Sequence, residues 1–383
     1  MSFFEGAEFF SYLLIVLIPA IALGVLEKPL RIYRFLASVL FLVLVFKDSG
    51  IQWKFLLLFI LWSMVIVKFY LWLREKTGKN FWICSLIVLL SLLPLIFNKV
   101  SSLAEQSIFG FLGISYITFK VVQIILESYD GIIKKISVFE YLDFILFFPA
   151  FSSGPIDRSR RYVCDGEKIW KRNEYIELVG DGLLKFFVGA VYKFVFSVIA
   201  YQILQNVFSD NYQPLYLVGY AYCYGIYMFF DFAGYSLMAV GISYILGIRT
   251  PDNFRAPFIS RDISDFWDRW HISLSHWFRD FIFSRLIMLN LRKKWIRNRL
   301  TSASVGLILN MFIMGVWHGL TPYYLLYGLY HGILLAINEI YQKKSSFYKL
   351  NKNKAWYKIL SWALTMNLVM FGFLIFSGHL YLI

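Results

Sequence analysis

Charged residues are scarce in this sequence. Only 16% of its 383 residues are Asp, Glu, Lys or Arg, against about 25% in a typical soluble domain. Cysteine is rarer still: Cys84, Cys164 and Cys223 are scattered without the spacing of a metal site, so neither a metal cluster nor a disulfide framework is expected. The first ten residues lack the basic segment and the small-residue cleavage motif of a secretory signal peptide, and we expect no cleaved leader.

The sequence also lacks the short motifs of several enzyme classes. It has no G-x-S-x-G motif, no paired Cys and His framework, no glycine-rich phosphate loop and no carboxylate-rich cluster. His271 and His276 are five residues apart, which on a helix turns their side chains about 140° from each other, so they are not expected to bind one metal ion. These absences argue against a serine hydrolase, a nucleotide-binding enzyme and a metal enzyme.

Hydrophobic residues, by contrast, make up 59% of the chain and aromatic residues 20%. Apolar stretches close to the length that spans a bilayer, about 20 residues, occur repeatedly. The net charge is +14. In a membrane protein such an excess of Lys and Arg belongs to cytoplasmic loops and to contacts with lipid headgroups, so nucleic acid is not expected as a partner. The composition predicts an all-α polytopic membrane protein.

We expect about ten crossings and two re-entrant or interfacial pieces in one integral membrane domain, residues 1–383. Within it we distinguish N-terminal helices (1–105), a central core (106–341) and a C-terminal helix (342–383). The basic residues that follow the first stretch place the N-terminus outside the cell. Residues 140–151 are too short to span and are expected to form a half-helix. The predicted spans are 9–26, 35–46, 53–72, 81–97, 109–126, 176–208, 215–246, 302–317, 323–341 and 357–377.

Polar residues inside these spans are expected to face the protein interior, because a charge in lipid costs a few kcal/mol at least. Lys120 and Gln123 lie in one span and Asp231 in the middle of another. The carboxylate of Asp231 needs a cationic partner or a water-filled cavity. The candidate partners are Lys185, Lys193 and Arg269.

The segment 261–285 combines many charges with many aromatic residues. A helical projection places its aromatic side chains on one stripe, with His271 at the edge of that stripe and His276 on the polar face. So many charges are not compatible with a plain crossing of the lipid. The segment is therefore expected to lie at the interface or to re-enter the protein.

Two histidines in these irregular membrane segments are candidates for proton transfer. His318 follows an apolar stretch and lies between Gly315 and Gly319, which permit the close approach of another backbone or of a ligand. A neutral imidazole is suited to taking a proton from a hydroxyl group near neutral pH. The alternative is a structural role, in which His318 or His271 is hydrogen-bonded within the packed protein.

Several motifs, in order along the chain, resemble the membrane-bound O-acyltransferase family, and within it the branch that acts in the D-alanylation of teichoic acids in Gram-positive bacteria. The resemblance extends from about residue 110 to 335. The motifs are FLGISYITFKVVQ (111–123), FFPAFSSGPIDR (147–158), FFDFAGYS (229–236), DFWDRWHISLSHWFRDFIF (265–283) and the later VWHG that contains His318.

The resemblance implies a ring of about ten transmembrane helices around a central tunnel. It implies that D-alanine arrives as a thioester on the phosphopantetheine arm of a small acidic carrier protein and passes to a hydroxyl acceptor, either teichoic acid or a relay protein. No tightly bound cofactor is implied, since phosphopantetheine comes with the carrier. His318 matches the family's catalytic histidine and His271 its second motif histidine, with Trp267, Trp317 and Ser275 as walls of the tunnel.

A carrier of this kind needs a docking surface on the cytoplasmic side. A basic cluster directly follows the His271 segment, and an apolar patch lies beside it. We expect the charges to steer the acidic carrier and the apolar residues to hold it; the alternative is that the charges only set the topology. The predicted docking residues are Leu286, Ile287, Met288, Arg292, Lys293 and Lys294.

Three other functions remain open from the sequence. The first is an acetyltransferase of the same family that modifies alginate or peptidoglycan with the same histidines. The second is a transporter or flippase that does no chemistry, and the third is a scaffold that recruits the other membrane proteins of D-alanylation. Costly polar groups in broken membrane helices argue against the last two, because neither needs them.

Overall fold

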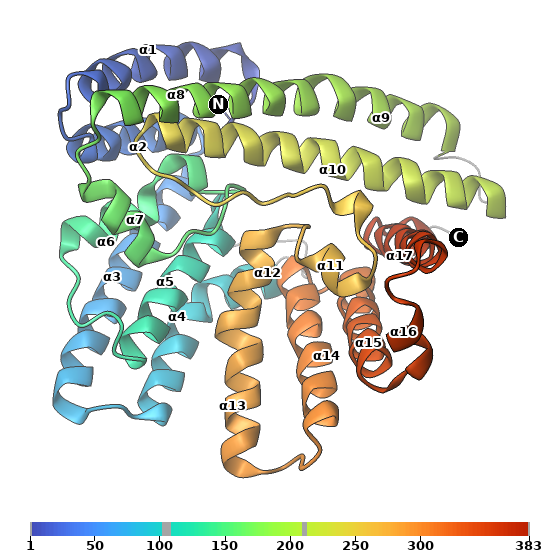
Figure 1. Cartoon of the computed structure of the whole chain (residues 1–383). Helices are drawn as coiled ribbons and strands as arrows, with labels where there is room; N and C mark the ends of the chain where they lie inside the picture. Colours follow the sequence, from blue (N-terminus) through green and yellow to red (C-terminus); the bar gives the residue numbers. More distant parts are fainter. Residues whose placement is uncertain (1, 102–108, 209–212, 382–383) are drawn as a thin grey trace. The chain divides into compact units, whose positions relative to one another are not determined.

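The computed structural model of the chain describes residues 2–101, 109–208 and 213–381, and these are mainly helical (Figure 1). In the described ranges, backbone pairing of the β type occurs at one isolated antiparallel bridge, between Phe254 and Trp270. Helices are the expected outcome for apolar stretches in lipid, because a helix satisfies its backbone hydrogen bonds internally. The predicted all-α class is confirmed.

The chain divides into two compact units, which are described separately. Unit 1 consists of Met1–Ala190 and Tyr235–Pro251, and unit 2 of Val191–Gly234 and Asp252–Ile383. The division into segments at residues 105 and 341 stays a prediction.

Unit 1 is built mainly from helices of the N-terminal half. They are α1 (Gly6–Val25), α2 (Arg31–Phe46), α3 (Ile51–Thr77), α4 (Phe81–Ser101), α5 (Ile114–Tyr129), α6 (Val138–Leu146), the short η2 (Phe148–Ala150), α7 (Ser159–Glu167) and α8 (Arg172–Val191). The last part of α10 (Pro214–Ile245) completes this unit.

Unit 2 holds the first part of α10 and most helices of the C-terminal half. The others are η3 (Tyr192–Phe196), α9 (Ser197–Ile203), η4 (Leu204–Phe208), η5 (Pro257–Ile259), α11 (Ile263–Trp267), α12 (Ile272–Phe278), η6 (Arg279–Phe283), α13 (Ser284–Lys293), α14 (Arg299–His318), α15 (Pro322–Lys344), α16 (Ser346–Asn351), α17 (Ala355–Phe376) and η7 (His379–Tyr381).

Seven helices in the described residues are long and apolar enough to cross a membrane, so the protein is a multi-pass membrane protein. Three further helices coincide with predicted spans without meeting that measure: α2 and α5, of 16 residues each, and the less apolar α15. The count of about ten crossings stays a prediction. The seven are α1, α3, α4, the continuous helix Arg172–Phe208, α10, α14 and α17.

The short piece predicted at 140–151 is confirmed as a nine-residue helix, α6, followed by η2 and a non-helical stretch. A capping box begins α6: Ser137 Oγ accepts from the N–H of Glu140 (3.1 Å), and the Glu140 carboxylate accepts from the N–H of Ser137 (2.7 Å). That backbone N–H keeps the pKa of Glu140 below its usual value. Pro94 lies inside α4, which continues to Ser101.

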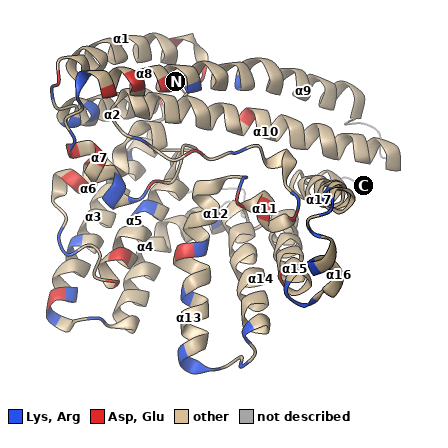
Figure 2. Cartoon of the chain, viewed as in Figure 1, with Lys and Arg blue, Asp and Glu red and all other residues tan. Residues whose placement is uncertain are grey.

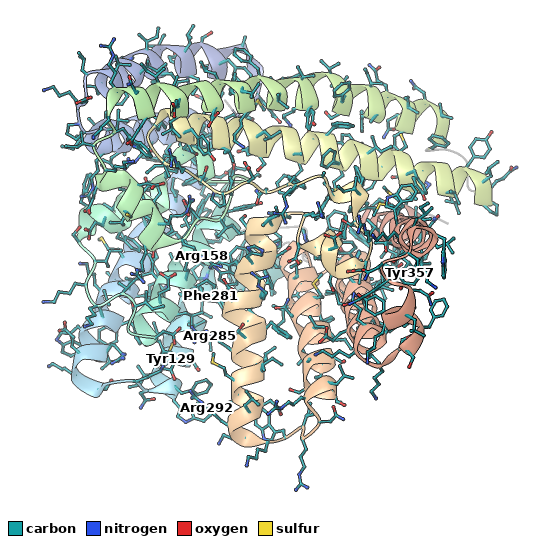
Figure 3. All side chains as sticks on the ribbon, in the orientation of Figure 1. Tyr129, Arg158, Phe281, Arg285, Arg292 and Tyr357 are labelled. Carbon is teal, nitrogen blue, oxygen red and sulfur yellow. The ribbon has the colours of Figure 1, made fainter. Side chains whose placement is uncertain are left out.

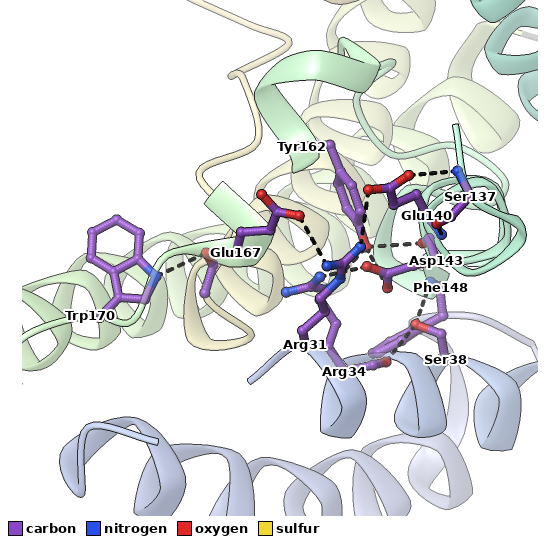
Figure 4. A network of polar contacts seen from close by, with 11 residues as sticks. Arg31, Arg34, Ser38, Ser137, Glu140, Asp143, Phe148, Tyr162, Glu167 and Trp170 are labelled. Carbon is purple, nitrogen blue, oxygen red and sulfur yellow. Dashed lines mark hydrogen bonds and ion pairs between the residues drawn. The ribbon is translucent and has the colours of Figure 1, made fainter. Parts of the chain in front are cut away.

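A buried polar network holds α2, α6 and α7 together in unit 1 (Figure 4). The guanidinium of Arg34, 1% exposed, lies 2.6 Å from the carboxylate of Asp143 and donates to the hydroxyl of Tyr162 (3.1 Å). Tyr162 in turn donates to Asp143. Because a buried charge that loses its partner costs about 3–5 kcal/mol, this network specifies how the three helices of unit 1 pack.

The polar residues predicted to face the interior of this unit do so. Lys120 and Gln123 in α5 are 1% and 0% exposed. The ammonium group of Lys120 donates to the carbonyl oxygen of Phe144 in α6, at 3.0 Å. The prediction of buried polar groups in this span is confirmed.

Candidate functional site

The aromatic segment at 261–285 is broken in its middle. α11 ends at Trp267 and α12 begins at Ile272, and His271 between them has φ 44° and ψ 52°, in the left-handed region. The helical projection, which treated the segment as one helix, was therefore wrong at this point. Most of the aromatic stripe is nevertheless buried. Its buried members are Phe266, Trp267, Trp270, Leu274, Trp277 and Phe278.

A neighbouring loop holds the backbone of His271 in this conformation. The carbonyl oxygen of Asn253 accepts from the N–H of Ile272 (2.9 Å), and the side-chain oxygen of Asn253 accepts from the hydroxyl of Ser273 (2.6 Å). The isolated antiparallel bridge lies directly next to these bonds. His271 is thereby fixed from both sides, is 4% exposed, and has no hydrogen-bond partner for Nε2 among the described residues.

His318 is the last residue of α14, which lies beside α15 in unit 2 (Figure 1). A Cβ atom at Gly315 would lie 2.5 Å from the carbonyl oxygen of Tyr324 and 3.1 Å from the Cα of Gly328. The two helices therefore touch backbone to backbone one turn before His318, which confirms the close approach predicted at Gly315. The ring of His318 packs edge-on against Phe376 of α17, with centroids 5.0 Å apart.

The two candidate histidines line one cavity of about 320 Å³ in unit 2. Trp267 lines it as well. Among the residues of this unit that the structure describes, the other two predicted tunnel residues are not part of the lining. Trp317 packs against His318 (ring centroids 4.6 Å apart), and the Ser275 hydroxyl is 3.3 Å from the carbonyl oxygen of Trp270. Their tunnel role stays a prediction.

The rest of the lining is largely aromatic, and its aromatic residues on α10, α15 and α17 were not identified from the sequence as cavity residues. α10 contributes Tyr224, Tyr227 and Asp231, α15 contributes Tyr327, and α17 contributes Phe376. The three α10 residues are spaced i, i+3 and i+7 and so share one helix face. The sequence did contain a pattern that could have indicated this face: Tyr227 and Tyr224 lie one and two helical turns before Asp231, an aspartate in a predicted span.

Asp231 is the one charged side chain among the described lining residues. Its carboxylate lies 2.8 Å from the ammonium group of Lys193 in η3, so one of the three candidate partners is the correct one. Arg269 instead pairs with Asp265, at 2.6 Å. The cavity therefore offers two imidazoles, several phenol groups and one carboxylate held by a lysine.

The predicted docking residues lie on α13 and the loop that joins it to α14. Lys and Arg gather at the C-terminal end of α13 (Figure 2), and Figure 3 labels Arg285 and Arg292 on this helix. Asn290 orders the loop by bonding both the N–H and the carbonyl oxygen of Ile296 (2.8 and 2.9 Å). Met288 and the basic residues are exposed, whereas Leu286 and Ile287 are half-buried.

These features define a multi-pass helical membrane protein with a histidine-lined cavity in its C-terminal unit. The model of the membrane-bound O-acyltransferase family matches residues 38–382, and the chain belongs to that family.

The chain is similar to curated teichoic acid D-alanyltransferases over nearly its full length. It is 42% identical to that of Bacillus subtilis (strain 168), over 99% of this chain and 98% of the relative. It is 40% identical to that of Streptococcus thermophilus, over 97% and 94%. Similarity to the probable alginate O-acetylase AlgI of Pseudomonas syringae is lower, 31% identity over 70% of this chain and 49% of the relative.

Proposed function

We propose that the protein is a teichoic acid D-alanyltransferase. It takes D-alanine from a thioester on the phosphopantetheine arm of a carrier protein and passes it to a hydroxyl acceptor across the membrane. The observation that carries the proposal is the shared cavity of His271 and His318. Similarity along both full lengths to teichoic acid D-alanyltransferases, against half-length similarity to alginate O-acetylases, supports D-alanine as the acyl group.

The reaction assigned to the cavity is acyl transfer from sulfur to oxygen. His318 takes the proton of the acceptor hydroxyl while the hydroxyl oxygen attacks the thioester carbonyl carbon. The tetrahedral intermediate collapses, the carbon–sulfur bond breaks, and the thiolate leaves and takes the proton back from His318. An ester and a free thiol result. A correctly placed general base contributes about 10²- to 10⁴-fold to the rate, and fixing both substrates in one cavity contributes further.

His271 has a different task in this scheme. Its backbone is fixed by Asn253 and its Nε2 has no protein partner among the described residues, so it is free to bond to the substrate. We assign it to orienting the donor arm or to stabilising the oxyanion of the intermediate. The indole of Trp267 and the rings of Tyr227 and Tyr327 enclose the reacting groups and exclude water that would hydrolyse the thioester.

The two substrates enter from opposite sides in this proposal. The basic loops face the cytoplasm and the N-terminus lies outside, as the distribution of Lys and Arg indicates. The donor thus arrives from the cytoplasm on its carrier, and the acceptor, teichoic acid or a relay protein, arrives from outside.

Expression of this protein in a Gram-positive strain that lacks its own D-alanyltransferase tests the proposal. D-alanine ester should reappear on teichoic acid, because the remaining proteins of the pathway supply the carrier-bound donor. The ester is measured after mild alkaline release. A strain that carries the empty vector is the control. Absence of ester with the protein present in the membrane contradicts the proposal, and acetyl ester in its place supports the acetyltransferase alternative.

We assign the binding site of the carrier protein to the C-terminal end of α13. Lys293 and Lys294 are exposed there, beside the exposed Met288 and Trp295, of which Trp295 is 70% exposed. Opposite charges speed the association of two proteins, and exposed apolar side chains stabilise the complex once it has formed. Because Asn290 orders the loop, binding does not have to fix it first.

Replacing Lys293 and Lys294 by Glu is expected to weaken binding of the acidic carrier at least tenfold, because two attractions become two repulsions. Binding is measured with purified protein and carrier at low salt, where the difference should be largest. The matched control is Lys344→Glu with Lys349→Glu, which makes the same charge change at two exposed lysines elsewhere in unit 2. Equal weakening by both pairs means that net charge alone acts, and unchanged binding by the variant of Lys293 and Lys294 removes this surface from the proposal.

A further inference from the structure

Unit 2 contains a second cavity, of about 620 Å³, which shares no lining residue with the histidine cavity. It lies where α15 ends, the short α16 turns the chain, and α17 begins, with the start of α11 closing one side. None of the residues assigned to acyl transfer contributes to it. The acyl-transfer site therefore does not account for this cavity.

One end of this cavity is apolar. α15 contributes Leu334 and Ile337, and α17 contributes Leu360, Leu364 and Leu368 at i, i+4 and i+8. Ile337, Leu360 and Leu364 are 57%, 61% and 62% exposed. From Leu360 to Leu368 the helix rises about 12 Å, so these side chains form a strip along a helix that is itself a candidate membrane span. In lipid, such a strip fits a hydrocarbon chain.

The opposite end is cationic. Arg261, Lys352 and Lys358 line it, and the structure shows none of them in an ion pair with a carboxylate in the described part of the chain. The one carboxylate in the lining, Asp262, is already engaged: it accepts from the N–H groups of Ser264 and Asp265 and from the side chain of Gln342. The described lining thus carries three cations against one carboxylate and is positively charged overall.

Aromatic side chains also line this cavity. Tyr341, Tyr348 and Tyr357 pack against one another, with ring centroids 5.6 and 6.1 Å apart for the pairs 341–348 and 348–357. Trp356 lines the cavity as well. Tyr and Trp gather in proteins where the lipid headgroups meet the hydrocarbon region. One cavity therefore combines the three kinds of side chain, cationic, aromatic and apolar, that suit the headgroup, the interface region and the acyl chain of a phospholipid.

We propose that this cavity binds one anionic glycerophospholipid, with its phosphate between Arg261, Lys352 and Lys358 and an acyl chain along Leu360, Leu364 and Leu368. The lipid would hold the corner between α15 and α17 in place. α15 and α17 also carry Tyr327 and Phe376 of the histidine cavity, so the lipid would stabilise two of the elements that shape it.

The headgroup part is tested by native mass spectrometry of the full-length protein in detergent with added phosphatidylglycerol or phosphatidylcholine. We expect one phosphatidylglycerol to be retained and phosphatidylcholine to be lost. Lys352→Gln with Lys358→Gln should weaken retention about fivefold for each cation removed. The control, Lys344→Gln with Lys349→Gln, removes the same charge from exposed lysines outside the lining. Equal retention of both lipids, or equal effects of both variants, overturns the proposal.

The acyl-chain part is tested by filling the strip. Leu364→Trp should reduce retention of phosphatidylglycerol, whereas Ile359→Trp should not, because Ile359 is equally exposed on α17 but does not line the cavity. If the lysine variant weakens binding while Leu364→Trp leaves it unchanged, the cavity binds a small anion and the assignment to a lipid is wrong. Because lipid retention is measured directly, these results do not depend on the acyl-transfer activity.

Discussion

Cells that carry His318→Ala should lose D-alanine ester from teichoic acid by about 10²- to 10⁴-fold, the range that a positioned general base contributes. Without the imidazole of His318 the acceptor hydroxyl loses the base positioned to take its proton, and it attacks the thioester as a neutral and weak nucleophile. The measurement is the D-alanine ester content of cells whose own enzyme is deleted, at equal membrane levels of wild type and variant.

The matched control is His276→Ala. His276 lies in α12 near the site, but it is not part of the cavity lining among the described residues. It should leave the ester content close to that of the wild type. Near-normal ester with His318→Ala would remove the base from the mechanism. His271 would then be the candidate base, or the protein would be a conduit while a partner does the chemistry, as the transporter alternative predicts.

Gly315→Val is expected to abolish activity by a different route, through the packing of α14 against α15. Its Cβ would fall 2.5 Å from the carbonyl oxygen of Tyr324, a backbone atom that cannot move without α15. Overpacking of this kind costs about 1–3 kcal/mol and sometimes more. Because His318 lies one turn further along the same helix, separation of the helices also displaces it from the cavity. We expect a lower thermal transition of the purified protein together with loss of D-alanine ester.

Gly180→Val separates this effect from the general effect of valine in a membrane helix. A Cβ at Gly180 in α8 meets no atom within 4 Å, so the change should be tolerated. If both variants lower the thermal transition equally, the contact between α14 and α15 is not the cause. If Gly315→Val keeps both the transition and the ester content, the backbone contact does not position His318.

The crossing segments were predictable because they depend on a local property, the length of an apolar stretch. The predicted stretch 176–208 matches a helix at Arg172–Phe208, and 357–377 matches α17 to within two residues at each end. Asp231 was predictable in the same way, since a carboxylate in a span needs a partner. Its partner, Lys193, was one of three candidates, because the choice depends on distances that the sequence does not contain.

The break at His271 could not be predicted, since no Gly or Pro interrupts residues 265–283. It results from pairing with the loop at Asn253, a contact between residues about twenty positions apart. Likewise, nothing marked Tyr327 or Phe376 as cavity residues, because an aromatic side chain in a membrane helix suits lipid, packing and a cavity equally well. The glycine at 315 was recognised, but its counterpart Gly328 was not, since only the crossing of α14 and α15 pairs them.

The left-handed backbone conformation at position 271 restricts which residue types this position favours. Apart from glycine, Asn, Asp and His enter this region several-fold more often than other residue types. Of these, only His has a side chain whose ordinary pKa lies near neutrality. The backbone conformation and the chemistry thus favour the same residue at this position for independent reasons. Removal of the imidazole alone is cleanest with Gly or Asn, because Ala would add backbone strain of about 1–2 kcal/mol to the chemical loss.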